Sequence, residues 1–319
     1  MLYLQLLELS KWLKLIINSE FGVCFERGYL EELLMRKYCY YRVGIIAVYK
    51  LLKRVRPKII VEVVGYSDAR LIINEVASEL GIPTYELQHG IIDKKHIAYN
   101  FAIKRNYAFF PDKMLIWGEH FREAKFPIED ENIIVTGFPY FEKNIRLFPP
   151  KSNTVALRIL VLSQPEYSEK LLQQIMELLD LLDEAGECYS LVYKPHPEEY
   201  RYYGSDKWDV FKKYENAILA PQGVSLYEWF SKSNIQVSVS STAVYEGLAY
   251  GLKTFLYSVD QTNMYMNTLV DEEYAHYFMD ALELVNLLRD NSCIKDINID
   301  KFFEKRAKEN ILREMRRNI

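Results

Sequence analysis

Short apolar runs alternate with longer segments of helical periodicity along most of this chain. Residues 1–55 have mainly helical spacing, and the first β-branched run, Lys58–Val64, is followed by a helical segment from Ala69 to Leu80. Short runs of this kind, bounded by turn residues, predict buried strands, and their alternation with helices predicts a parallel sheet. Further strands of the first half are expected at 83–87, 113–117 and 132–135.

The same alternation restarts after residues 149–153, where two prolines followed by Lys, Ser and Asn indicate a linker. Strands are expected at 158–162, 189–193, 217–219, 235–239 and 254–257, and helices at 169–185, from about 225 and through 246. The pattern therefore predicts an α/β protein with two Rossmann-like domains facing a central cleft, which is the GT-B arrangement. The expected parts are residues 1–148 (acceptor side), 149–299 (nucleotide-donor side) and 300–319 (a basic C-terminal helix).

The first 17 residues are apolar at helical spacing but are interrupted by Glu8, Lys11 and Lys14. These charges argue against a membrane span, and no signal-peptide cleavage site follows. The segment predicts an amphipathic helix, for which a core-facing position is favoured over a membrane-surface position.

Charge and cysteine content narrow the class of protein. The 319 residues include 40 Lys+Arg and 44 Asp+Glu, so the chain lacks the strongly basic balance of a general nucleic-acid binder. The four cysteines form no Cys-x-x-Cys pair, which favours reduced thiols in a cytoplasmic protein over a disulfide framework or a zinc site. The sequence has no Walker A, GxGxxG, HExxH or Asp-x-Asp motif, so we expect no bound metal and no cofactor.

Two polar segments follow predicted strands of the second domain. Lys194 and His196, on a loop stiffened by two prolines, supply a cation and an imidazole after the strand at 189–193. Ser240, Ser241 and Thr242 supply hydroxyls and backbone N–H groups after the strand at 235–239. Both segments end strands, where open α/β sheets bind ligands, so together they predict a cradle for a nucleotide phosphate. A helix N-cap formed by one of the hydroxyls is compatible with this role.

Three further residues are candidates for the donor side. Glu246 lies one turn into the next helix, where it would either accept hydrogen bonds from ribose hydroxyls or stabilise the positive end of the helix. Ser163 and Gln164 end the first strand of the second domain and are candidate contacts to the donor phosphate.

The best candidate for a catalytic group is His89, which ends a strand of the first domain just before Gly90. A neutral imidazole is suited to removing a proton from an acceptor hydroxyl near pH 7. A structural histidine bonded to a neighbouring loop is the alternative, and His96 in the following polar loop is the second candidate base.

The turn Gly65-Tyr66-Ser67 ends another strand of the first domain. It is expected to line the acceptor side together with Gly90 and His96. A tight turn carrying a helix N-cap would explain the same residues equally well.

Several of these motifs together resemble bacterial surface-polysaccharide glycosyltransferases of GT-B fold, over about residues 58–258. Capsule transferases for Kdo and sialic acid, and teichoic-acid polymerases, share the Lys-Pro-His-Pro and Ser-Ser pair. The resemblance implies a cytidine nucleotide donor whose phosphate is held by His196, Ser240 and Ser241. It rests on Gln88-His89-Gly90, Trp117-Gly118-Glu119, Thr136-Gly137-Phe138-Pro139, Tyr193-Lys194-Pro195-His196-Pro197, Ser240-Ser241 and Glu246-Gly247-Leu248.

Two departures from these families bear on the assignment. Bacterial sialyltransferases carry an acidic pair before the glycine where this chain has Gln88-His89-Gly90, which is more similar to the glycerophosphate polymerases. The first domain also shows about four strands, whereas about six are usual. The first of these departures points away from a sialyltransferase.

The function expected from the sequence is an inverting, metal-independent glycosyltransferase that extends a bacterial surface glycan from a nucleotide-activated sugar. The alternatives are a CDP-polyol phosphotransferase of teichoic-acid type, a UDP-sugar-dependent transferase, a nucleotide-sugar epimerase, and a catalytically silent GT-B module that scaffolds polysaccharide assembly. The clustered acidic residues that an epimerase needs are not evident from the sequence.

The expected partners are a nucleotide-sugar donor and an oligosaccharide or lipid-linked glycan acceptor, and nucleic acid is not expected. The basic segment 300–319 would either hold a cytoplasmic protein at the inner face of the cell membrane or form a solvated helix packed on the fold. The sequence leaves homo-oligomerisation open.

Overall fold

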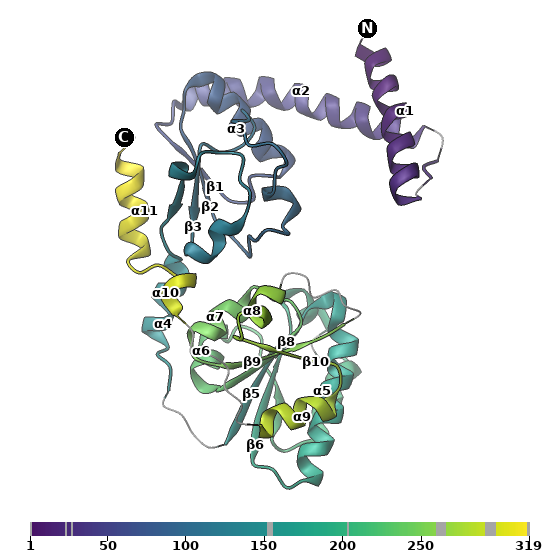
Figure 1. Cartoon of the computed structure of the whole chain (residues 1–319), viewed down its shortest axis with the longest axis vertical. Coiled ribbons are helices and arrows are strands. Elements are labelled where there is room, and N and C mark those ends of the chain that lie inside the picture. The colour runs from purple at the N-terminus through teal and green to yellow at the C-terminus, as the bar shows by residue number, and fades with distance from the viewer. Residues whose placement is uncertain are drawn as a thin grey trace.

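Two α/β units, one above the other in Figure 1, follow a pair of N-terminal helices. The helices are α1 (Leu2–Phe21) and α2 (Tyr29–Val55). The computed structural model describes residues 2–22, 24–26, 28–151, 156–202, 204–259, 266–290 and 298–317.

The first unit contains a parallel sheet in the simple order β1-β2-β3-β4. All four strands and the helix after the first one are confirmed within a few residues of their predicted bounds, and the expectation of about four strands holds for the described residues. The elements are β1 (Ile60–Glu62), α3 (Asp68–Leu80), β2 (Thr84–Leu87), β3 (Lys113–Ile116), β4 (Ile133–Val135) and α4 (Pro139–Leu147), with short 3-10 turns at Ile97–Tyr99, Glu119–Glu123 and Asp130–Asn132.

The second unit contains a six-stranded parallel sheet in the order β10-β9-β8-β5-β6-β7. The chain starts at β5, builds outward through β6 and β7, and then returns to build the other side from β8. The strands are β5 (Leu157–Leu162), β6 (Tyr189–Lys194), β7 (Ala217–Leu219), β8 (Ile235–Ser238), β9 (Lys253–Tyr257) and β10 (His276–Phe278). The boundary between β5 and β8 is the topological switch point, where ligands bind in sheets of this kind.

Helices cover the second sheet, and they form where the sequence has apolar residues at helical spacing. In α5 (Ser168–Glu184) the residues Leu171, Ile175, Leu178 and Leu182 recur every three or four positions and are buried. The sequence did not predict β10 or α9, the last strand and helix of this unit. The other helices are α6 (Leu226–Lys232), α7 (Ala243–Ala249), α8 (Asn267–Asp271) and α9 (Ala281–Arg289), with 3-10 turns at Pro165–Tyr167, Pro197–Tyr202 and Asp206–Lys213.

The C-terminal segment returns to the first unit as two helices, α10 (Ile299–Phe302) and α11 (Ala307–Arg316). Residues 303–306 separate the two helices: Phe303 is extended and Arg306 has a φ of 60°, so the single helix that the sequence suggests is broken here. Ile311 packs against Tyr85 and Leu115 of the first sheet. The apolar face of α11 is therefore covered by the fold, and its exposed face carries the basic side chains.

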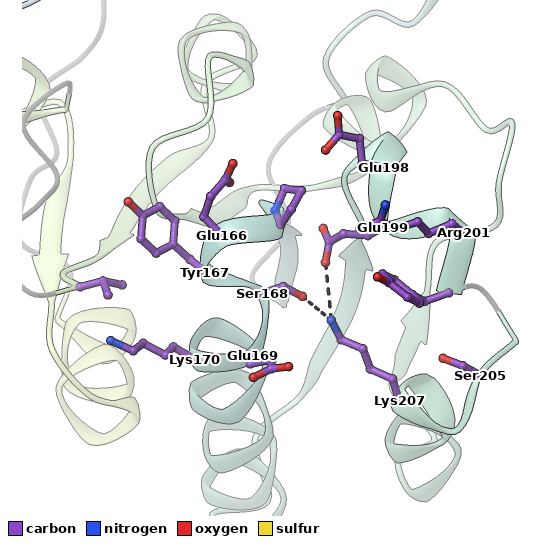
Figure 2. Close-up of a pocket in the computed structure, with 13 residues that line it drawn as sticks. Glu166, Tyr167, Ser168, Glu169, Lys170, Glu198, Glu199, Arg201, Ser205 and Lys207 are labelled. Carbon is purple, nitrogen blue, oxygen red and sulfur yellow. Dashed lines mark hydrogen bonds and ion pairs between the residues drawn. The ribbon is translucent and has the colours of Figure 1, made fainter. Parts of the chain in front are cut away.

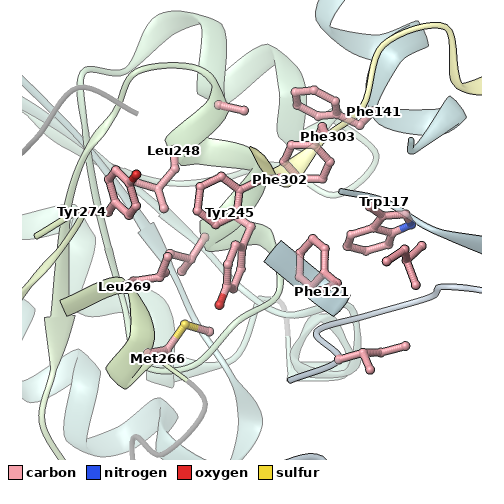
Figure 3. Packing of buried hydrophobic residues seen from close by; sticks show 14 of the residues in the cluster. Trp117, Phe121, Phe141, Tyr245, Leu248, Met266, Leu269, Tyr274, Phe302 and Phe303 are labelled. Atoms are coloured by element: carbon pink, nitrogen blue, oxygen red, sulfur yellow. The ribbon is translucent and has the colours of Figure 1, made fainter. Parts of the chain in front are cut away.

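One hydrophobic cluster holds side chains from both units and from α10 (Figure 3). Phe121 of the first unit lies 5.7 Å from Tyr245 of α7, and the His120 ring lies 4.6 Å from Phe302, measured between ring centroids. A Cβ built on Gly118 would lie only 2.4 Å from the backbone oxygen of Lys301. The two units thus meet through a packed core at this point.

The N-terminal helices lie at the end of the first unit farthest from the second unit (Figure 1). α2 packs on α3 through Leu52, and α1 is joined to α2 by the Lys14–Glu31 ion pair at 2.7 Å. The favoured core-facing position of the first helix is wrong, since Trp12 is 58% exposed and Leu15 is 71% exposed. α1 packs against α2 and lies away from both sheets (Figure 1). Several of its apolar side chains therefore remain exposed to solvent.

Candidate functional site

Loops from both sides of the switch point are joined by one glutamine. The Oε1 atom of Gln164, which follows β5, accepts hydrogen bonds from the backbone N–H of Ser240 at 2.8 Å and from its hydroxyl at 3.2 Å. Ser240 follows β8, the neighbour of β5. The structure therefore brings these two predicted donor-side segments together where the fold places its ligand sites.

Ser241 and Thr242 complete the turn into α7. The Ser241 hydroxyl accepts a hydrogen bond from the backbone N–H of Ala243 at 3.3 Å, while Thr242 occupies the N-cap position without a side-chain cap. Both side chains are half-buried. The hydrogen bond expected at the N-terminus of α7 thus involves the Ser241 hydroxyl. The Thr242 hydroxyl faces Gly90 of the first unit.

Lys194 and His196 leave the end of β6 on the same edge of the sheet. The Nζ atom of Lys194 donates to the hydroxyl of Tyr200 at 2.8 Å and lies 4.6 Å from the centroid of its ring. Burial lowers the pKa of Lys194 from its ordinary value. The Nδ1 atom of His196 accepts from the backbone N–H of Glu198 at 3.3 Å, so the neutral ring carries its proton on Nε2 and can donate there.

Ser163 lies deeper than a phosphate contact requires. Its side chain is buried, and its hydroxyl donates to Glu199 at 3.2 Å and accepts from Tyr193 at 3.0 Å. Glu199 also accepts a hydrogen bond from the backbone N–H of His196 at 2.8 Å. In this structure Ser163 therefore helps Glu199 to hold the His196 loop, and its hydroxyl is not turned to the open edge.

The carboxylate of Glu246 is likewise engaged within the protein. Its Oε2 atom accepts a hydrogen bond from the hydroxyl of Tyr227 on α6. Burial raises the pKa of Glu246 to about 7. Its contact to a ribose therefore stays a prediction.

A cavity of about 760 Å³ opens beside these loops at the carboxyl edge of the sheet. Its wall comes from the segments that follow β5, β6 and β9, and Figure 2 shows Lys207 reaching into it to bond Ser168 at 2.6 Å, 3.8 Å from Glu199. The volume is in the range of small-molecule sites. Charged side chains of both signs line it: Lys170, Arg201, Lys207, Glu166, Glu169, Glu198 and Glu199.

On the first unit, the rings of Tyr66, His89, His96 and Tyr99 form one cluster. The Tyr66 ring lies 6.0 Å from His89, 5.7 Å from His96 and 5.5 Å from Tyr99, and the rings of His96 and Tyr99 are 4.8 Å apart. Tyr66 and His96 were predicted for the acceptor side from separate parts of the sequence. The structure brings both beside the candidate base.

Two buried glutamates lie behind this ring cluster. The Oε1 atom of Glu86 accepts hydrogen bonds from the backbone N–H of Gly65 at 3.0 Å and from the Tyr99 hydroxyl, and it lies 4.0 Å from Nδ1 of His89. Burial raises the pKa of Glu86, and it raises that of Glu62 to about 7. From the sequence we found no clustered acidic residues. This expectation is wrong, because β1 and β2 bring these two carboxyl groups together.

Burial also sets the protonation of the two histidines. It lowers the pKa of His89, and the nearby His96 lowers it further, while burial lowers that of His96 as well. Both imidazoles therefore stay neutral at pH 7, as a general base requires. Ser67 lies at the N-cap of α3 and uses no side-chain cap, so it is placed beside the cluster but outside its ring contacts.

The donor side and the acceptor side meet between Gly90 and Thr242. A Cβ built on Gly90 would lie 3.7 Å from the Thr242 hydroxyl oxygen. His89, which precedes Gly90, is thus held next to the segment that follows β8. Within the described part of the chain, no three His, Cys, Asp or Glu side chains are grouped so that they could hold a metal ion.

The sequence reasoning missed four residues of this arrangement: Glu62, Glu86, Glu199 and Tyr227. For the two strand glutamates a signal was present, because a carboxylate within an apolar strand is costly to bury and calls for a partner. Tyr227 bonds Glu246, 19 positions away, and Glu199 bonds Ser163, 36 positions away, so the local pattern marks neither of them.

Comparison with known proteins places the fold. No family model matches the chain. A Methanocaldococcus jannaschii protein, "Uncharacterized protein MJ1060", is 28% identical over 212 residues, which are 63% of this chain and 36% of that one. The chain thus spans about a third of the length of the curated relative it matches.

Solved structures share the architecture across most of the chain. A putative UDP-N-acetylglucosamine 2-epimerase from Listeria monocytogenes has a TM-score of 0.60 at 14% identity, covering 86% of this chain and 78% of its own. The UDP-GlcNAc 2-epimerase of M. jannaschii, solved with UDP-GlcNAc and UDP, has a TM-score of 0.57 at 16% identity, covering 87% and 80%. MurG of Acinetobacter baumannii has a TM-score of 0.55 at 12% identity, covering 86% and 77%. The chain has the GT-B fold, with two Rossmann-like domains.

Proposed function

We propose that this protein is an inverting, metal-independent glycosyltransferase that moves a sugar from a nucleotide donor to a growing surface glycan. The observation that supports the proposal is the contact between the donor-side turn of the second domain and the acceptor-side loop of the first domain. Gln164 and Ser240 join the loops of the switch point, and Thr242 of the same turn lies against Gly90, next to His89. A base on one domain thus faces a phosphate-binding turn on the other.

In the proposed reaction the donor nucleotide lies along the carboxyl edge of the second sheet. Its phosphate would meet Ser241, Thr242 and the Nε2–H of His196, while the cavity beside Lys207 has room for another part of the nucleotide. Lys194 adds positive charge on the same edge. These groups would stabilise the negative charge of the departing nucleotide phosphate.

The acceptor would enter beside the rings of Tyr66 and His96. His89 takes the proton of the acceptor hydroxyl as the oxygen bonds to the anomeric carbon. The bond from that carbon to the nucleotide phosphate breaks on the opposite face, so the configuration inverts. An oligosaccharide or a lipid-linked glycan fits this role, because exposed aromatic rings pack well against the faces of sugars.

The donor base is proposed from the sequence resemblance, which favours cytidine. The test is a thermal-shift titration of the purified protein with CMP, CDP, UDP and GDP, with and without magnesium. A ligand that binds only the folded state raises the melting temperature. We expect a magnesium-independent rise with a cytidine nucleotide. A rise with UDP or GDP alone would replace the donor, and no rise with any nucleotide would contradict the proposed function in favour of a silent scaffold.

A second candidate function is a nucleotide-sugar epimerase, and the buried pair Glu62 and Glu86 favours it. Carboxyl groups with raised pKa values can exchange protons near neutral pH, as epimerisation at a sugar carbon requires. Two of the solved structures with the same fold carry that name, one of them as a putative enzyme. An epimerase needs no acceptor. Incubating the protein with the nucleotide sugar alone in deuterated water therefore separates the two, since only an epimerase incorporates deuterium at the sugar carbon.

A further inference from the structure

The most uneven distribution of charge in the described chain lies on α2 and the turn after it. The protein as a whole carries a formal net charge of -4, yet no acidic residue occurs between positions 33 and 58. Every basic side chain of this stretch is exposed. They are Arg36, Lys37, Arg42, Lys50, Lys53, Arg54, Arg56 and Lys58.

The same helix exposes a stripe of large apolar side chains. Tyr40 is 51% exposed, Val43 68% and Leu51 55%. Tyr40, Val43 and Leu51 follow the spacing that places residues on one face of a helix. We call this stripe, with the cations along it, the outer face of α2.

The outer face lies beside the contact that holds α2 in the fold. Ile45, Val48 and Leu52 pack on α3 against Val76 and Ala77, about a third of a turn from Tyr40, Val43 and Leu51. Figure 1 shows α2 along the end of the first domain that lies farthest from the second domain. A partner on the outer face would therefore leave the space between the domains open.

Lys50 and Arg54 lie on the outer face itself. They are three and seven residues beyond Ala47, which follows Val43 by one turn, so charge and apolar surface share one side of the helix. An apolar groove of about 450 Å³ between α2 and α3 continues this surface. Its lining residues are Cys39, Tyr40, Val43, Gly44, Val48, Ala69, Ile72 and Ile73.

We propose that the outer face of α2 binds the surface of a bilayer that contains anionic lipid. Exposed aliphatic side chains enter the boundary between headgroups and acyl chains, while the surrounding cations meet the headgroup charge. The helix lies on the bilayer and does not cross it: none of the described helices has the length and apolar character of a membrane span. α2 thus takes the role that the sequence suggests for the C-terminal helix.

A second copy of the chain and a nucleic acid fit the outer face less well than an anionic bilayer does. A symmetric dimer would place the face against its own copy, so that two sets of cations would meet with no acidic residue of α2 after Glu32 to offset them. Nucleic acid would satisfy the cations but would leave Tyr40, Val43 and Leu51 without an apolar partner. An anionic bilayer satisfies both features at once.

The test is co-sedimentation of the full chain with vesicles of phosphatidylcholine alone or mixed with phosphatidylglycerol. We expect binding to the mixed vesicles, weakened by added salt. Each cation near such a surface contributes about fivefold to partitioning, so K50Q/R54Q should lower the partition coefficient roughly thirtyfold. V43S/L51S should lower it by about tenfold or more, because it removes inserted apolar surface.

The matched control is R313Q/R316Q, which removes two exposed cations from α11. It should bind the mixed vesicles like the unchanged protein. All substitutions are at exposed positions, and equal thermal melting verifies that each variant is folded. The proposal is overturned if the unchanged protein does not sediment with the mixed vesicles, if R313Q/R316Q loses as much binding as K50Q/R54Q, or if a dimer that V43S/L51S dissociates forms in place of vesicle binding. None of these readouts depends on nucleotide binding or turnover, so the proposed function is tested separately.

Discussion

Gln164 holds Ser240 in place by accepting hydrogen bonds from both its backbone N–H, at 2.8 Å, and its hydroxyl, at 3.2 Å. The two residues follow neighbouring strands of the second sheet but are 76 positions apart in sequence. Because both polar groups of Ser240 are engaged by Gln164, the neighbouring Ser241 and Thr242 are left to face a ligand. We therefore expect Gln164 to act as a positioning residue, whose own side chain does not have to contact the phosphate of the proposed donor.

Removing the Gln164 side chain should therefore weaken nucleotide binding. Gln164→Ala leaves the Ser240 N–H without its partner and frees the turn, at a cost of about 1–3 kcal/mol, or roughly fivefold to 150-fold in affinity. Titration calorimetry with the nucleotide that gives the thermal shift measures this. Gln173→Ala, at an exposed position of α5, is the matched control and should bind normally. Equal affinities for the two variants would remove Gln164 from the site.

Replacing the candidate base should separate turnover from binding. His89→Ala is expected to lower kcat by about 10²–10⁴-fold, while the Kd for the nucleotide stays within twofold, about 0.4 kcal/mol, because His89 belongs to the other domain. His96→Ala is the comparison, with a smaller loss expected. If His96→Ala abolishes turnover and His89→Ala retains most of it, the two roles must be exchanged.

The pH dependence of the proposed reaction should reflect the protonation of His89. Burial and His96 lower the pKa of His89, so its neutral, basic form persists below pH 6.5. The acid limb of the kcat/KM profile is accordingly expected below pH 6.5, with activity lost as the imidazole becomes protonated. A limb centred well above pH 6.5 would indicate a different base.

The periodicity of the sequence predicted nine of the ten strands that the structure describes. The strand Ile133–Val135, for example, is a continuous apolar run, as is typical of parallel strands that are buried on both faces. β10, by contrast, escaped notice: its three residues, His276 to Phe278, begin with a histidine and show no apolar run. Its position is fixed by pairing with β9, which is information from elsewhere in the chain.

The sequence predicted those residues of the candidate site that come directly after a strand. Rules of topology alone bring Gln164 to Ser240, and His89 lies at an end that faces the same space. The pairing of Glu86 with Tyr99 and of Glu246 with Tyr227 was not predictable, since side-chain direction decides it. The broken C-terminal helix was hidden too, because Arg306 in a left-handed conformation has no sequence signal of the kind that glycine gives.

The contact between the domains can be tested at a glycine. A Cβ at position 118 would lie 2.4 Å from the backbone oxygen of Lys301, so Gly118→Ala must displace α10 and should destabilise the protein by about 1–3 kcal/mol. Gly90→Ala is the matched control, since its Cβ meets only Thr242 at an ordinary 3.7 Å. Its stability should change by less than about 0.5 kcal/mol. Urea denaturation of both variants measures the difference, and equal losses would contradict the packing described here.

His120 should make the interdomain core sensitive to acid. Its ring is buried against Phe121, Tyr245 and Phe302, and burial lowers its pKa from 6.5 to about 4. Between these two pH values the unfolded chain binds a proton that the folded chain does not. The contribution of His120 to stability is therefore complete above pH 6.5 and declines as the pH falls toward 4, by on the order of 3 kcal/mol.

Glu62 and Glu246 oppose this trend, because burial raises their pKa values from 4.5 to about 7. The folded chain holds these protons in the same pH window, so each adds stability as the pH falls through it. The pH dependence of the unfolding free energy therefore contains contributions of both signs. The effect of His120 is isolated by the difference in unfolding free energy between the unchanged protein and His120→Phe. This difference should shift against the unchanged protein between pH 6.5 and 4 and be constant above pH 7. A difference that does not vary with pH would show that the folded protein does not keep His120 neutral.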